Sequence, residues 1–200
     1  MKSKLVVFAL VLFVVAPAFG ETIVLDQDRL VQHLQRTNEK FLKSVDGLSE
    51  AQWNFKPAPD KWSIAQCAEH IAAAETLIRG AVEKGLATPL DPAEKTAELI
   101  KDDMIATMVV DRSKKLSAPE PLVPTQRFGS PAATVEAFQK ERAATIKLAQ
   151  SDAEFRAHAV KHPAFGMLDT YGWMLFLSAH SERHTLQIEE VKTHPDFPKN

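Results

Sequence analysis

The chain has 200 residues, of which 45% are hydrophobic and 25% charged, a balance typical of one folded globular domain and unlike that of a disordered chain. Its formal net charge is −2 and it carries no basic stripe, so the sequence argues against nucleic acid as a partner. The single cysteine, Cys67, has no partner for a disulfide within the chain, and we expect it to be buried and inert.

The first twenty residues have the pattern of a secretory signal peptide. Two lysines precede an apolar run from Leu5 to Val15, and small residues follow, so that cleavage after either Ala18 or Gly20 fits. The run is shorter than the roughly 20 residues that cross a bilayer, and no second run follows, so we expect no membrane span after cleavage. The sequence therefore predicts a periplasmic or secreted protein with a signal peptide at 1–20 and one domain at 21–200.

The domain begins with helical spacing. Apolar residues recur every three or four positions between Asp26, which can cap a helix, and Gly47, which can end it. A single helical turn is expected at 49–53, followed by a loop that contains two prolines. A capping-box sequence at 63–66 predicts the start of a second long helix, and Gly85 is its stop signal.

The middle of the chain is less regular. Residues 92–115 fit a helix with Leu99, Met104 and Met108 as its apolar positions. Several prolines follow, and a long crossover is the simplest account of the whole region. Residues 134–150 again have helical spacing and form the third long helix.

Two histidine pairs with a spacing of four residues follow. His158 and His162 precede Pro163, which pushes the preceding residue out of helical geometry, so we expect this pair to lie in a loop.

The second pair, His180 and His184, lies in a helix that Asp169 or Thr170 can cap and that runs to about Val191. Residues i and i+4 share a helical face, and apolar neighbours at the same spacing indicate that this face is buried. A buried imidazole needs a hydrogen-bond partner or a metal. This stretch alone leaves satisfied core histidines and a metal site equally open.

Four long helices with a long crossover between helices two and three predict an all-α four-helix bundle, whose interior can host a metal. The ligands would be His70, on the second long helix, with His180 and His184. Three neutral imidazoles leave an open position, as in catalytic sites, where a metal can activate water or a thiol or polarise a carbonyl. Glu75 is a candidate general base, although a solvated boundary position is the better interpretation. Glu182 and Arg183 are expected to face solvent or each other.

Three stretches together resemble the DinB/YfiT-like superfamily: WSIAQ at 62–66 running into EHI at 69–71, HPAFG at 162–166, and Trp173 through HSERHTLQI at 180–188. The likeness covers nearly the whole chain after the signal peptide. It implies a four-helix bundle with this crossover and a metal triad of one histidine on helix two and an H-x-x-x-H pair on helix four. His70, His180 and His184 match these positions.

The resemblance implies a divalent metal, with zinc, nickel and manganese all found in the family, and imidazole ligands do not choose among them. Characterised members look like thiol-dependent transferases and isomerases that work in the cytoplasm. Because this chain is predicted to be exported, where small thiols are scarce, a metal-dependent hydrolase of unknown substrate is equally favoured. The alternatives are a non-catalytic bundle that binds a metal or a small ligand, and a bundle, or a homodimer of bundles, whose histidines are only core residues.

Overall fold

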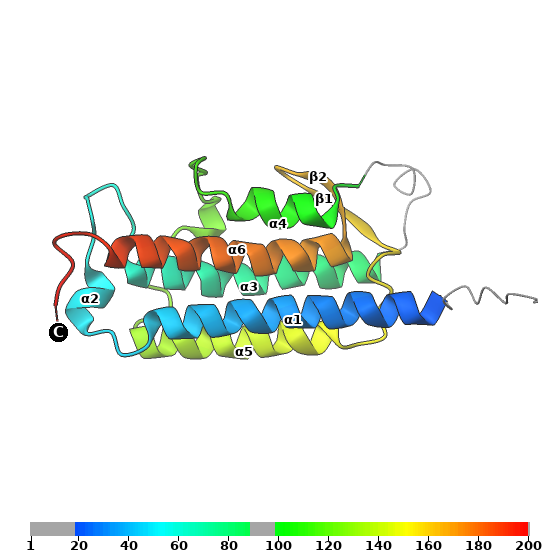
Figure 1. The fold of residues 1–200 in the computed structure, drawn as a ribbon, viewed down its shortest axis with the longest axis horizontal. Helices are drawn as coiled ribbons and strands as arrows, with labels where there is room; N and C mark the ends of the chain where they lie inside the picture. The colour runs from blue at the N-terminus through cyan, green and yellow to red at the C-terminus, as the bar shows by residue number, and fades with distance from the viewer. Residues whose placement is uncertain (1–18, 89–98, 200) are drawn as a thin grey trace, which may run out of the picture.

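The computed structural model describes residues 19–88 and 99–199, so most of the predicted signal peptide lies outside the described residues. Four long helices lie side by side (Figure 1): α1 (Phe19–Val45), α3 (Ile64–Ala87), α5 (Pro131–Ala149) and α6 (Thr170–Lys192). Both α1 and α3 contact α5 and α6, so the four helices share one core. The predicted all-α four-helix bundle is confirmed, as is the long crossover between its second and third long helices.

Three helix starts follow the signals in the sequence. Ser49 and Ser63 each form a capping box with the glutamine three residues later, at the starts of α2 (Glu50–Asn54) and α3. Asp169 caps α6, because its Oδ1 accepts a hydrogen bond from the backbone N–H of Gly172 at 2.6 Å. The cap of α6 fixes where its histidines lie along the bundle.

The first helix begins earlier than expected. It starts at Phe19, and Asp26 lies inside it. The Asp26 carboxylate does not cap the helix; its Oδ2 accepts a hydrogen bond from Nε of Arg156 at 3.2 Å. The end of the helix is as predicted, since Gly47 follows it with a φ of +66°.

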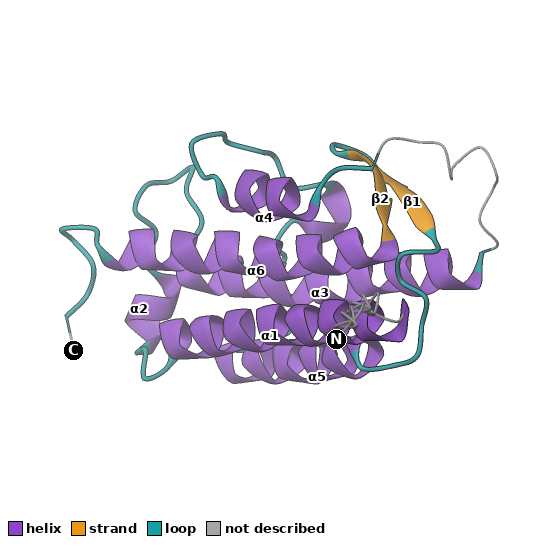
Figure 2. Ribbon diagram, turned by 45° about the vertical axis from the view of Figure 1, so that its right-hand side comes forward, coloured by secondary structure: helices purple, strands orange, loops and turns teal. Residues whose placement is uncertain are grey.

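The crossover contains α4 (Asp102–Val110) and a short 3₁₀ turn, η2 (Glu120–Leu122). Figure 2 shows α4 on the outside of the bundle, where it packs on α6. Of the helix predicted at 92–115, only the part from 99 onward lies within the described residues, and it is shorter than expected.

The apolar positions named for this helix do not face the core. Ile105 and Val109 are buried against the core, whereas Leu99, Met104 and Met108 are exposed. Both sets keep a spacing of four or five residues, and Ile105 and Val109 each follow one of the two methionines directly. The apolar pattern alone therefore did not determine which face α4 turns toward α6.

Residues 159–169 form a hairpin and not the expected loop. Strands β1 (Ala159–His162) and β2 (Gly166–Asp169) pair antiparallel, with the first residue of β1 opposite the last of β2. Gly166, at this turn, has a φ of +76°, a conformation that residues with a side chain rarely adopt. The hairpin packs against α3 and the start of α6.

No helix within residues 19–88 and 99–199 is long and apolar enough to cross a membrane.

Gly85 lies inside α3 and serves close packing, where we had expected it to end the helix. A Cβ at this position would lie 2.5 Å from Cγ2 of Val160 and 3.0 Å from Cγ2 of Thr170. We therefore expect Gly85→Ala to lower the free energy of unfolding by about 1–3 kcal/mol through overpacking. Urea denaturation measures it.

The control is Gly80→Ala in the same helix, where no atom lies within 4 Å of the added Cβ. That change should raise stability by up to about 1 kcal/mol through helix propensity. Equal shifts in the two variants would show that the contact with the hairpin is unimportant.

Candidate metal centre

The three histidines singled out in the sequence lie together between α3 and α6. Nε2 of His70 is 3.1 Å from Nε2 of His180. Each of His70, His180 and His184 offers one ring nitrogen to a group whose atoms all lie within 4.8 Å of one another. The structure thus brings His70 of α3 close to His180 and His184 of α6.

Hydrogen bonds fix the orientation of two of the rings. Nδ1 of His70 lies 2.8 Å from the carbonyl oxygen of Leu122, which can only accept, so Nδ1 carries the proton and Nε2 keeps its lone pair. Nδ1 of His184 lies 2.9 Å from Oε1 of Gln187, and this oxygen also accepts a hydrogen bond from Nη1 of Arg112 at 3.2 Å. Such outer partners are what metal-binding histidines usually have.

His180 differs from the other two. Its Nδ1 is buried and has no hydrogen-bond partner among the described residues, so the protein fixes neither its tautomer nor its charge through that atom. Its Nε2 faces His70.

The donor set fits a divalent metal ion. Tetrahedral coordination by imidazole at about 2.0–2.1 Å places two ligand nitrogens roughly 3.3 Å apart, close to the 3.1 Å between Nε2 of His70 and Nε2 of His180. The donor nitrogen of His184 lies within 4.8 Å of the other two.

The three imidazoles are neutral at neutral pH. Desolvation by burial lowers the pKa of His70, lowers that of His184 to about 3, and holds that of His180 well below its ordinary value. The neighbouring imidazoles lower the pKa values of His180 and His184 further. Neutral rings offer the lone pairs that a metal requires.

Aromatic rings enclose the histidines. Trp62, next to the capping Ser63, has its ring centroid 4.9 Å from that of His70 and 6.0 Å from that of His184. Phe176 packs against His180 at 5.9 Å. Apolar walls of this kind limit the access of water to the site.

Cys67 does not belong to the histidine cluster. It is fully buried, and desolvation raises the pKa of its thiol to about 12. The thiol is therefore protonated at neutral pH, and the prediction that Cys67 is buried is confirmed.

The interpretation of Glu75 as a solvated residue is wrong. Its carboxylate is buried against Arg142, whose Nε donates to Oε2 of Glu75 at 3.1 Å. Arg142 also donates to the carbonyl oxygen of Leu34 at 2.8 Å and to the hydroxyls of Thr37 and Ser181, both at 2.7 Å. These residues come from all four long helices, so the network is a structural centre and leaves Glu75 no role as a general base.

Arg183 and Glu182 do not pair with each other. Arg183 is buried and donates to the carbonyl oxygens of Val109 at 3.1 Å and Lys114 at 2.7 Å, so it ties the crossover to α6. Glu182 instead pairs with Lys40 of α1 at 2.5 Å. The sequence held no local signal for these partners, because they come from distant segments.

The earlier histidine pair does not join the cluster, as expected. His162 packs against Phe165, Trp173 and Phe176, and its Nδ1 accepts hydrogen bonds from the backbone N–H groups of Ala164 and Phe165, both at 3.1 Å. The ring therefore holds the turn of the hairpin.

Burial lowers the pKa of His162 to about 4. Because the unfolded chain binds a proton near pH 6.5 and the folded chain only near pH 4, stability should fall as pH drops through this window, by up to about 3 kcal/mol from this group. In His162→Asn, whose Oδ1 can still accept from the turn, denaturation between pH 7 and 4 should show a shallower decline. An unchanged slope would contradict the assignment.

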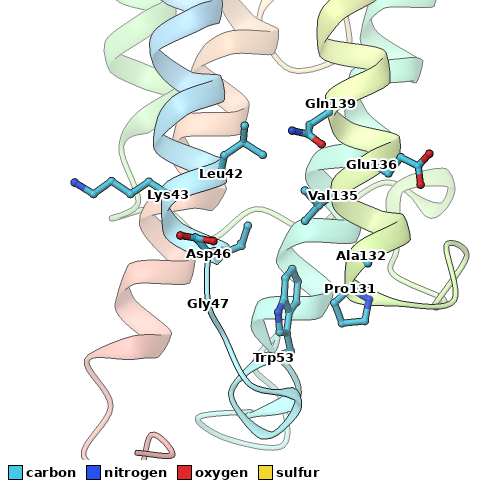
Figure 3. A pocket seen from close by; sticks show the side chains of 11 residues that line it. Leu42, Lys43, Asp46, Gly47, Trp53, Pro131, Ala132, Val135, Glu136 and Gln139 are labelled. Carbon is cyan, nitrogen blue, oxygen red and sulfur yellow. The ribbon is translucent and has the colours of Figure 1, made fainter. Parts of the chain in front are cut away.

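An open groove lies elsewhere, at the α2 end of the bundle (Figure 3). It runs between α1 and α5, with Trp53 of α2 at its base and Leu42 and Val135 on its sides. None of the three clustered histidines lines it.

Comparison with known proteins agrees with the fold. The uncharacterized protein YuaE of Bacillus subtilis is 27% identical over 156 residues, which cover 74% of this chain and 88% of YuaE. The structure of YfiT from Bacillus subtilis, described as a probable metal-dependent hydrolase with an unusual four-helix bundle topology, matches with a TM-score of 0.57. The match covers 83% of this chain and 85% of YfiT at 14% sequence identity, so it shows a shared fold.

The family model of the DinB superfamily matches residues 33–188, which include α3, α5, the crossover, the three clustered histidines and parts of α1 and α6. The chain therefore belongs to the DinB superfamily.

Proposed function

We propose that this chain is a metal-dependent hydrolase in which His70, His180 and His184 hold a divalent metal ion. The observation that carries the proposal is the convergence of one nitrogen from each imidazole within 4.8 Å. The hydrogen bonds from His70 to Leu122 and from His184 to Gln187 support it, since they leave the inner nitrogens free. The description of YfiT as a probable metal-dependent hydrolase agrees with it.

A bound divalent ion with three neutral ligands supplies an open position, lowers the pKa of water and polarises a carbonyl. The chain itself supplies the orientation of the rings and the aromatic walls of Trp62 and Phe176, against which an apolar part of a substrate can pack. Glu75 and Glu69 take no part in proton transfer, because both carboxylates are held by hydrogen bonds within the protein. Zinc, nickel and manganese are the metals to test.

The test compares the metal-free chain with the same protein reconstituted with zinc, nickel or manganese, on a panel of carboxylic esters, amides and phosphoesters. Metal-dependent hydrolysis that disappears in His180→Ala and persists in His33→Ala, a change on the surface of α1, would support the proposal. Transfer of part of a substrate to an added thiol, without hydrolysis, would contradict the hydrolase proposal and favour a thiol-dependent transferase. Bound metal without any turnover would replace it by a non-catalytic binding protein.

We also propose that residues 1–20 direct export. The two lysines, the apolar run and the small residues that follow support this. N-terminal sequencing of the protein from a periplasmic or secreted fraction should give a mature start at residue 19 or 21, and an intact Met1 would contradict it. A homodimer stays a prediction, which light scattering can check.

A further inference from the structure

A backbone atom of the crossover contacts one of the three histidines directly. The carbonyl oxygen of Leu122, at the end of η2, accepts the hydrogen bond from Nδ1 of His70 at 2.8 Å. This oxygen sets which nitrogen of His70 is protonated and where the ring points. The segment around Leu122 is only a three-residue 3₁₀ turn, so other contacts must hold this carbonyl in place.

Glu69, the residue before His70, binds the crossover directly. Its buried carboxylate accepts hydrogen bonds from three consecutive backbone N–H groups, those of Thr125 at 2.7 Å, Gln126 at 2.8 Å and Arg127 at 3.2 Å. Three converging N–H groups make an anion-binding nest.

The turn that forms this nest has an unusual backbone. Gln126 has a φ of +64° and is the one residue other than glycine with positive φ among the described residues. Side chains other than glycine rarely adopt this left-handed conformation. Here it allows successive N–H groups to point at the same carboxylate.

Arg127 connects Glu69 to the residues on both sides of Leu122. Its Nε donates to Oε1 of Glu69 at 3.1 Å, its Nη1 to the carbonyl oxygen of Pro121 at 2.9 Å, and its Nη2 to that of Val123 at 2.8 Å. The planar guanidinium therefore fixes the carbonyls that flank Leu122. A hydrogen-bonded chain runs from Glu69 through Arg127 and the backbone at 121–123 back to His70.

We propose that Glu69 and Arg127 are positioning residues, which hold the Leu122 carbonyl so that His70 keeps its proton on Nδ1 and turns its Nε2 toward His180 and His184. The effect on metal affinity rests on the proposed function, whereas the effect on the His70 ring does not. Because of this pair, all three histidines are oriented to bind a metal only when the crossover is correctly folded.

The experiment uses the full domain with Arg127→Ala and, as a second variant of nearly equal volume, Glu69→Gln. Two-bond ¹⁵N–¹H spectra of the metal-free protein report the tautomer of His70, and competition with a chromophoric chelator gives the affinity for zinc alone. We expect the parent to show His70 protonated on Nδ1, and both variants to show a mixture of tautomers. Zinc affinity should fall roughly 10–100-fold, the usual cost of losing an outer-shell contact.

The control is Arg79→Ala, which removes an arginine of α3 that pairs with Glu141 of α5. This change can lower stability but should leave both the His70 tautomer and zinc affinity as in the parent. Arg127→Lys keeps the charge but lacks the planar guanidinium that holds two carbonyls. It should therefore preserve the His70 tautomer and the zinc affinity only in part.

The outcomes separate the two proposals. Variants that fold and keep both the Nδ1–H signal and the parent's zinc affinity would overturn the positioning role, while the metal site would stand. A parent that binds no zinc, but whose His70 tautomer depends on Arg127 and Glu69, would overturn the metal site and leave the positioning role supported.

Discussion

Replacing Arg142 by methionine should lower the free energy of unfolding by about 3–5 kcal/mol, because it leaves the Glu75 carboxylate charged and unpaired in the core. Both side chains are about 1% exposed. Thr145 and Ser181 donate to the same carboxylate, at 3.3 Å and 3.1 Å, but hydroxyl groups do not replace a guanidinium. Since a domain is stable by about 5–15 kcal/mol in all, chemical denaturation should show a protein close to unfolding.

The double variant Arg142→Met with Glu75→Leu separates the cost of a stranded charge from the value of the pair. Apolar replacement of a whole buried pair is often neutral or better, so most of the lost stability should return. Arg36→Met is the control, because Arg36 is half exposed where it meets Glu182, and exposed pairs contribute less than about 1 kcal/mol. A single variant that loses no more than this control would contradict the central role of the network.

His184→Ala should abolish stoichiometric metal binding. The parent, purified without a tag, should carry close to one metal ion per chain by plasma mass spectrometry. Removing one of three ligands should weaken binding by more than the roughly 10–100-fold that loss of a supporting hydrogen bond costs. Competition with a chelator measures the affinity where the metal content is too low.

His158→Ala, prepared in the same way, is the matched control, because His158 is half-buried away from the cluster, where its Nδ1 lies 3.0 Å from the carbonyl oxygen of Thr88. Its metal content should equal that of the parent. Equal and negligible metal in all three proteins, even after reconstitution, would leave the three histidines as core residues without a ligand.

The elements that the sequence predicted correctly are those with local physical causes. The capping box at Ser63 and the spacing of apolar residues depend on neighbours within one or two turns, so they located the helices that carry the histidines. The i, i+4 pair on α6 is equally local. The third residue, His70, was chosen from its place on the second long helix, and its match to a family pattern then supported it.

The predictions that failed depend on partners far along the chain. Glu75 and Arg183 look like surface charges until Arg142 and the backbone of the crossover are brought beside them. The hairpin at 159–169 has strands of four residues, too short for alternation to indicate a strand. The nest around Glu69 needs a left-handed Gln126, which its residue type does not predict.

The burial of Cys67 makes this residue a reporter of local opening. It is the protein's one thiol, it is fully enclosed, and it lies one turn before His70 on α3. A thiol reagent can reach it only when the first turns of α3 separate from the core. The rate of labelling therefore reports how often such openings occur. A ligand that bridges α3 and α6 through the histidines should suppress those openings, and its binding could then be followed by the slowing of labelling at a residue that it does not touch.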